Sequence, residues 1–257
     1  MIPGSVESLG KYPFPQNTII RRPDNYRPEG VLTADMVRQQ FGEVEYIESI
    51  TVPEGITKID VACFRNMRIG TISLPNSLQE LGWGAFSGCE IKTVTFPQNL
   101  QKIGDDCFFG SSIEKVCIPG NVKIVGDRAF SKCKHLTKVT LNEGIEVIRE
   151  SCFSHSPVKH IEIPKSVKNL SKKTFKGCEQ LKTVTLHEGL EHIEFSCFRF
   201  TAIRTITIPS SVQTIDNWAF RECKQLQSVT LQEGLKNIGD ACFRETAVES
   251  IKIPKSV

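Results

Sequence analysis

The sequence lacks most of the features by which a nucleic-acid-binding or membrane protein is recognised. Its 32 lysines and arginines nearly balance 29 aspartates and glutamates, so the formal net charge is only +3. That balance gives no electrostatic reason to expect a nucleic acid or an anionic membrane as partner. No apolar run is long enough to cross a bilayer, and the start of the chain lacks the hydrophobic region of a signal peptide. We therefore expect neither nucleic-acid binding nor membrane insertion.

Enzyme motifs are also lacking. The sequence has no phosphate loop, nucleophile elbow or zinc-protease motif, and its cysteines lack the C-x-x-C spacing of a zinc finger. The close histidine pairs, His155 with His160 and His187 with His192, are five residues apart, which is not a same-face helical spacing. We expect these histidines to be exposed polar residues. The sequence predicts no enzyme, no cofactor and no metal site.

What the chain has instead is a phenylalanine that returns at steps of 22 or 23 residues. A fixed period of roughly 20 to 50 residues indicates one small supersecondary unit stacked on copies of itself. The fold class is therefore a repeat solenoid, and we expect the recurring phenylalanines to form one buried column. They are Phe64, Phe86, Phe108, Phe130, Phe153, Phe175, Phe198, Phe220 and Phe243.

Each unit combines a strand pattern with a proline turn. Ile161 and Ile163 are separated by one polar residue, which is the period of a strand with one buried face. Pro164 has no N–H to donate to a ladder and ends the strand. A second apolar pair, Val167 and Leu170, brings the chain across the back of the coil, and we expect helical or 3-10 geometry at the phenylalanine that follows. The unit is too short for a long helix and a strand, so successive strands form one parallel sheet.

This pattern resembles the BspA-type leucine-rich repeat, whose coils read I-x-x-I-x-I-P-x-x-V-x-x-I-x-x-x-A-F-x-x-C-x-x-L. Residues 206–223 match it almost position for position, including Pro209, Phe220 and Cys223, and the resemblance covers roughly residues 47–257. It implies a leucine-rich-repeat-like, right-handed coil stack with a parallel β-sheet on one face, mostly strands and turns. It also implies a bacterial or protist protein, often a surface protein used in adhesion.

Residues 1–46 break the period and are predicted to form an N-terminal cap. A short amphipathic helix is expected near residues 33–41, because this stretch opens on a threonine, a typical N-cap, and places Met36, Val37 and Phe41 on one face. A terminal coil of a solenoid exposes an apolar core on its outer side, and an atypical segment usually covers it.

The predicted repeat domain is 47–257, truncated in the middle of a repeat at the C-terminus. Residues 2–10 look like half of a repeat, so the start is either a degenerate coil or the edge of a longer array. Because the last coil, which ends at Val257, has no cap, we expect further repeats or an edge-to-edge contact there.

Ten cysteines follow the repeat. Members of one column are two coils apart, about 10 Å at the strand spacing, beyond the ~7 Å limit between Cα atoms for a disulfide. A pair from different columns, such as Cys89 and Cys107, comes nearer, so a disulfide ladder and a metal site stay as alternatives. We expect buried, free thiols that act as small apolar filler. Cys63, Cys107, Cys152, Cys197 and Cys242 precede the phenylalanine, and Cys89, Cys133, Cys178 and Cys223 follow it three residues later.

The outward residues of the predicted strands form the candidate partner-binding face. One column is mostly threonine, whose β-branch suits an exposed strand position. Beside it we expect a basic series with one member per coil, Lys92, Lys115, Lys138, Lys159, Lys182 and Arg204. An unused sheet with solvated lysines explains the same residues. The candidate face comprises Lys92, Thr95, Lys138, Thr140, Glu162, Lys182, Thr185, Arg204 and Thr207.

A long rigid sheet without a reactive group indicates a non-enzymatic protein–protein interaction module. The resemblance implies a cell-surface adhesion or host-binding protein. Two alternatives are an intracellular scaffold or recognition subunit, which cysteines that look reduced favour, and the substrate-recognition domain of a larger enzyme. The expected partner is a protein whose identity the sequence does not specify, and the compartment stays open between the cytoplasm and the cell surface.

Overall fold

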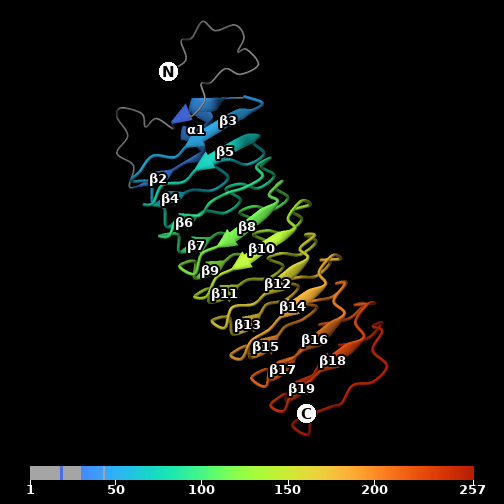
Figure 1. Cartoon of the computed structure of the whole chain (residues 1–257). Helices are drawn as coiled ribbons and strands as arrows, with labels where there is room; N and C mark the ends of the chain where they lie inside the picture. The colour runs from blue at the N-terminus through green and yellow to red at the C-terminus, as the bar shows by residue number, and fades with distance from the viewer. Residues whose placement is uncertain (1–17, 20–29, 43) are drawn as a thin grey trace, which may run out of the picture.

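The computed structural model describes residues 18–19, 30–42 and 44–257. In this part the chain winds into a stack of similar coils, with the blue N-terminal elements at one end and the red C-terminal coils at the other (Figure 1). The expected solenoid with parallel strands is confirmed. The half repeat suggested at residues 2–10 lies outside the described residues.

The helix α1 (Ala34–Phe41) is the only helix in the described part of the chain. The hydroxyl of Thr33 accepts a hydrogen bond from the N–H of Met36 at 3.4 Å and caps its first turn. Met36, Val37 and Phe41 are buried in the core of the stack. No helix among the described residues is long and apolar enough to span a bilayer. The division of the chain into a cap and a repeat domain stays a prediction.

The continuous sheet is built from the second apolar pair of each coil. Each copy contributes a two-residue strand. Every strand except the two at the ends pairs in parallel with its equivalents on both sides, as Leu170 does with Ile148 and Ile193. From the sequence we expected this second apolar pair only to carry the chain across the back of the coil, without forming a strand. Two residues are enough because adjacent coils in register satisfy the N–H and C=O groups of each other. The strands are β2 (Val31–Leu32), β4 (Lys58–Ile59), β6 (Glu80–Leu81), β7 (Lys102–Ile103), β9 (Ile124–Val125), β11 (Val147–Ile148), β13 (Asn169–Leu170), β15 (His192–Ile193), β17 (Thr214–Ile215) and β19 (Asn237–Ile238).

The strands predicted at the first apolar pair are present, but they form several short sheets. One sheet contains β1 (Thr18–Ile19), β3 (Ile47–Thr51) and β5 (Ile69–Ser73). The others pair β8 (Lys115–Ile118) with β10 (Lys138–Leu141), β12 (His160–Glu162) with β14 (Thr183–Thr185), and β16 (Thr205–Thr207) with β18 (Ser228–Thr230). We predicted the long parallel sheet at the first apolar pair of each coil, and the structure places it at the second pair.

Contacts between turns also join neighbouring coils, and in the second half of the stack they do so where the strand ladder is interrupted. After β10, the carboxylate of Glu143 accepts the N–H of Lys165 at 3.0 Å. In return, the hydroxyl of Ser166 accepts the N–H of Gly144 at 3.0 Å and donates to the carbonyl of Ile145 at 2.7 Å. We call this two-way contact the turn clamp. It recurs in the turns of Glu54 with Ser77, Glu188 with Ser211 and Glu233 with Ser256.

Ladders and clamps alternate along the second half of the stack. A ladder joins β8 to β10, β12 to β14 and β16 to β18. Turn clamps join the coil of β10 to that of β12, and the coil of β14 to that of β16. The structural unit of this half is therefore a pair of coils rather than a single coil.

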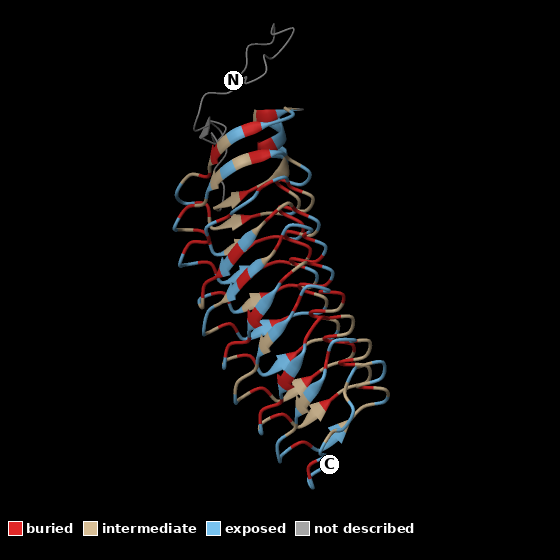
Figure 2. Ribbon diagram, turned by 45° about the vertical axis from the view of Figure 1, so that its right-hand side comes forward, coloured by how far each residue is buried: buried red, intermediate tan, exposed pale blue. Residues whose placement is uncertain are grey.

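The recurring phenylalanines form the predicted column. Rings in successive coils stack with centroids 5.0 to 5.6 Å apart. Eight of the nine are fully buried, and Phe243, in the last coil of the described chain, is partly buried. Figure 2 shows buried residues inside the coils and exposed residues on the strands and outer turns. The core is thus one continuous cluster along the stack.

The segment around each phenylalanine is a turn and not the helical or 3-10 segment that we expected. Around Phe153, both Ser151 and His155 adopt left-handed backbone with φ of 57°. The N–H of Phe153 bonds to the carbonyl of Thr174 in the next coil at 2.9 Å, rather than within a helix. Left-handed residues end a right-handed helix, so two of them so close together reverse the chain instead.

All ten cysteines are free, nine of them are buried, and Cys117 is exposed. Three of the four cysteines that follow a phenylalanine, Cys133, Cys178 and Cys223, are also hydrogen-bond donors, which refines the expectation of apolar filler. The thiol of Cys133 donates to the carbonyl of Phe108 at 3.0 Å. In an intervening coil the hydroxyl of Ser156 donates to the carbonyl of Phe130 in the same way, at 2.7 Å.

Candidate functional site

The strand face is defined here as the exposed residues in and directly before the first strand of each coil, and at the equivalent positions of the coil that forms no strand there. It carries all nine residues of the predicted partner-binding face, and every one of them is exposed. In the strand pairs, Thr140 lies opposite Cys117, and Glu162 lies opposite Thr185. Thr207 is likewise paired with a threonine of the next coil. The structure therefore places these side chains in register across neighbouring coils.

The basic residues do not form the single series that we expected. Lys138 lies directly opposite Lys115 in the β8–β10 pair. Lys92 occupies a position one residue earlier in its own coil, and its ammonium pairs with the carboxylate of Glu114 at 3.8 Å. Lys159, Lys182 and Arg204 share the position of Lys92. The expected series mixed two columns whose side chains point in different directions, since successive residues of a strand alternate.

The charged residues of the strand face differ in their partners. The carboxylate of Glu162 lies 2.8 Å from the Nε2 atom of His187. The guanidinium of Arg204 donates to the side-chain oxygen of Gln225 at 3.5 Å. Within residues 30–42 and 44–257, the ammonium groups of Lys138 and Lys182 form no ion pair. These two exposed cations are therefore free to meet an acidic group.

A groove of about 1150 Å³ lies on the N-terminal part of the strand face. Two rows of residues, each repeating from coil to coil, line its sides. One row contains Tyr46, Arg68, Glu90, Ser112 and His135. The other contains Glu48, Gly70, Lys92 and Glu114, so that Lys92 belongs both to the predicted face and to the groove. Sequence reasoning missed the groove, because its first row lies just before the strands.

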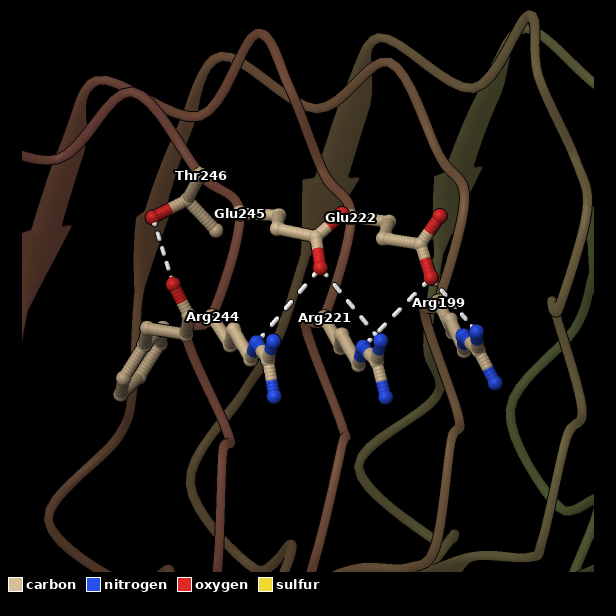
Figure 3. Close-up of polar contacts among 7 residues, drawn as sticks. Arg199, Arg221, Glu222, Arg244, Glu245 and Thr246 are labelled. Carbon is tan, nitrogen blue, oxygen red and sulfur yellow. Dashed lines mark hydrogen bonds and ion pairs between the residues drawn. The ribbon is translucent and has the colours of Figure 1, made fainter.

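A charged ladder lies on the turns beside the phenylalanine column in the C-terminal coils (Figure 3). The carboxylate of Glu222 pairs with both Arg199 and Arg221, and that of Glu245 pairs with Arg221 and with the arginine at 244. The ring of Trp218 lies 5.3 and 5.2 Å from the guanidinium carbons of Arg199 and Arg221. Because each carboxylate already contacts two cations, the ladder joins coils rather than presenting free charge.

The two histidine pairs differ in exposure. His155 and His160 are exposed, as expected, whereas His187 and His192 are partly buried. Burial, with the nearby charges of two lysines, lowers the pKa of His155. No group of three or more histidine, cysteine, aspartate or glutamate side chains in the described chain is arranged to hold a metal ion.

Comparisons with known proteins point to one family. The family model described as "BspA type Leucine rich repeat region" matches residues 35–157 and 146–257, with six copies. No curated protein sequence matches the chain.

Several solved structures share the fold. A leucine-rich repeat protein from Bacteroides ovatus has a TM-score of 0.60 and 24% identity, over 81% of this chain and 67% of that one. A leucine rich cell surface protein from Faecalibacterium prausnitzii has a TM-score of 0.58 and 22% identity, over 94% and 76%. The pneumococcal vaccine antigen PcpA has a TM-score of 0.53 and 24% identity, over 85% of this chain and 54% of that one.

Proposed function

Because this chain belongs to the BspA-type leucine-rich repeat family, we propose that it is a non-enzymatic protein-binding module that holds its partner across the strand face. Leucine-rich repeats are generally a fold for interaction. A solenoid presents an extended surface without remodelling any single coil. The strand face is the part of that surface where side chains repeat in register.

The observation that carries the proposal is the free charge on this face. Lys138 and Lys182 are exposed and have no acidic partner in residues 30–42 and 44–257. Arg204 adds a third cation whose recorded side-chain contact is a neutral glutamine oxygen. An acidic patch on a partner protein would complement these groups and would speed association at low salt. The interrupted threonine column, with Glu162 beside His187, offers a point of specificity.

Adhesion at a cell surface is the finer form of the proposal. Among the structurally similar proteins, one is named a leucine rich cell surface protein and another a vaccine antigen. An intracellular scaffold is the second candidate, and the ten free cysteines favour it. Thiol titration of protein purified from its own cells without reductant separates the two. Ten thiols in denaturant support the scaffold, whereas fewer than ten indicate an oxidising compartment.

The partner face is tested with a charge reversal of Lys138, Lys182 and Arg204 to glutamate together. The immobilised chain first captures partners from an extract of its own cells, and a partner identified by mass spectrometry is then purified. We expect the triple variant to bind this partner at least about tenfold more weakly than the unchanged chain, because each reversal places like charges together.

A matched control keeps the same change in net charge. Lys165, Lys172 and Lys236 are exposed but lie outside the strand face, and their reversal to glutamate should leave the affinity within about twofold. Unchanged binding by the Lys138, Lys182 and Arg204 variant, with normal circular dichroism, would place the partner elsewhere on the chain.

A further inference from the structure

The strand ladder is interrupted beside the groove on the strand face. β5 pairs with β3 on one side. On its other side, no backbone hydrogen bond joins Thr71–Ser73 to the following coil in the described chain, although the N–H of Ile69 still bonds to the carbonyl of Glu90 at 3.2 Å. The equivalent stretch of that coil forms no strand and has only an isolated bridge between Thr93 and Lys115.

A glycine at position 70 keeps the groove open. Gly70 lies at the position that lysine or arginine occupies in the coils of Lys159, Lys182 and Arg204. A β-carbon at Gly70 would lie 2.6 Å from the hydroxyl of Tyr46 and still closer to backbone, so only glycine fits there. The hydroxyl of Tyr46 therefore lies over the backbone at Gly70 and forms one wall of the groove.

The charges of the groove are unbalanced. Three carboxylates line it, together with one arginine and one lysine. Arg68 pairs with Glu90 at 2.8 Å, and Lys92 pairs with Glu114 at 3.8 Å. Glu48 is exposed and, within residues 30–42 and 44–257, forms no ion pair. The groove thus carries one negative charge in excess, in a chain whose formal net charge is +3.

The length of the groove fits an extended peptide. Its longer row crosses four coil steps, from Tyr46 to His135, and the nearby ring stacks are 5.0 to 5.1 Å apart. The span is therefore about 20 Å, which is the length of about six residues of extended chain.

We propose that the groove binds an extended segment of a partner protein that carries a lysine or arginine, with this cation held by Glu48 and its aliphatic stem against the ring of Tyr46. The inference rests on the proposed protein-binding function and adds the chemistry of the segment that is recognised. A guanidinium is favoured over an ammonium, because it forms paired hydrogen bonds with a carboxylate and stacks on an aromatic ring.

Fluorescein-labelled hexapeptides test the proposal by anisotropy titration of the whole 257-residue chain. The probes are three repeats of Ser-Arg, Ser-Gln or Ser-Glu. We expect saturable binding of the Ser-Arg peptide, at least about tenfold tighter than that of the Ser-Gln peptide, and no binding of the Ser-Glu peptide. Equal affinity for all three probes, a preference for Ser-Glu, or no binding of any probe would overturn the proposal.

Matched variants locate the binding. Glu48→Gln should weaken the Ser-Arg peptide about tenfold, whereas Glu249→Gln, at the equivalent position of the last coil, should not. Thr71→Arg should abolish binding by filling the groove with a like charge, and Thr205→Arg, at the same position of another coil, should not. Equal effects of the groove variants and their controls would overturn the assignment.

The two proposals fail separately. If reversal of Lys138, Lys182 and Arg204 weakens the protein partner but no probe binds, the strand face stands and the groove is rejected. If the Ser-Arg peptide binds and Glu48→Gln weakens it, while the reversal leaves the partner unaffected, the groove stands and the wider face is rejected.

Discussion

The thiol of Cys178 donates a hydrogen bond of 3.1 Å to the carbonyl oxygen of Phe153, which lies 25 residues earlier in the chain. This bond adds to the one that the same carbonyl accepts from the N–H of Ser156 at 3.2 Å, in a turn that belongs to no strand ladder. Ser156 performs the same role toward Phe130, with a bond of 2.7 Å. The column of cysteine, serine and threonine beside the rings is therefore selected for a donor as well as for size.

Replacing Cys178 tests this role. Cys178→Ala removes the side-chain donor to the Phe153 carbonyl, which keeps its bond from the N–H of Ser156 at 3.2 Å. It should lower the free energy of unfolding by about 1 kcal/mol, the net contribution of one hydrogen bond. Cys178→Ser keeps a donor and should cost less. Urea denaturation measures both. The control is Cys152→Ala, at a position where other coils have alanine. If the two alanine variants lose the same stability, packing alone explains the cysteine.

Phe153 lies at the centre of the ring column, with centroids 5.6 and 5.5 Å from its two neighbours. Phe153→Ala should reduce the free energy of unfolding by about 3–5 kcal/mol, because it leaves a cavity in a fully buried core. Phe243→Ala should cost clearly less, since that ring is only partly buried. Thermal denaturation followed by circular dichroism gives the comparison. An unchanged melting temperature for the Phe153 variant would contradict the burial of the column.

The buried thiols predict that the protein loses stability in alkali. Burial raises the pKa of Cys89 and of Cys178 from 9.0 to about 12. Below about pH 9 the thiols are protonated in both states, so their contribution is fully present. Above it the unfolded chain ionises first, and the contribution is lost as the pH rises toward 12. Denaturation midpoints between pH 8 and pH 11 measure the slope.

Other groups also titrate in this range, so the slope needs a matched variant. Cys107, Cys152 and Cys197 occupy the column in which other coils have alanine or threonine, and desolvation raises the pKa of each thiol. Replacing all three with alanine should flatten the loss of stability between pH 9 and pH 11. A slope equal to that of the unchanged protein would show that these thiols do not cause it.

The turn clamp predicts coupling between Glu188 and Ser211. Partial burial opposes ionisation of Glu188, but hydrogen bonds from Ser210 and Ser211 outweigh it, so the pKa of the carboxyl is lowered from 4.5. Its contribution is therefore present above pH 4.5 and is lost as the pH falls below that value. In a double-mutant cycle of Glu188→Gln and Ser211→Ala at pH 7, we expect a coupling on the order of 0.5 kcal/mol, small because the carboxylate is exposed.

The coupling should shrink as the pH falls below 4.5 and the carboxyl becomes protonated. Glu179→Gln serves as the control, since Glu179 is exposed and takes no part in a turn clamp. Its cycle with Ser211→Ala should be additive. Additivity of the Glu188 cycle at pH 7 would mean that the turn contact contributes nothing to stability.

The solenoid fold and its buried core could be predicted from the sequence. A phenylalanine such as Phe153 and a cysteine such as Cys152 recur at a fixed period, and repeated burial explains that period. The sequence did not show which strand column is continuous. Two-residue strands such as Asn169–Leu170 carry almost no periodic signal and depend on coils that are adjacent in space. The left-handed turns were hidden for a similar reason, since lysine and serine hold positions where glycine would have marked them.

The candidate face was predicted less completely. Exposure of residues such as Thr140 and Glu162 followed from strand alternation. The register between neighbouring coils could not be predicted in this way. The sequence analysis therefore placed Lys92 and Lys115 in one basic series, although Lys92 pairs with Glu114. One signal was overlooked: from Phe130 onward the steps between phenylalanines alternate strictly between 23 and 22 residues.

That alternation bears on how the array can change its length. Removing one coil from the second half, for example residues 158–180, would bring two coils of the same kind together and leave the Glu143 turn without its serine. Removing two coils, as in residues 158–202, would restore both the ladder and the clamp. Duplications or deletions of about 45 residues, which add or remove two coils, should therefore preserve the fold. A longer solenoid should likewise be built by inserting pairs of coils.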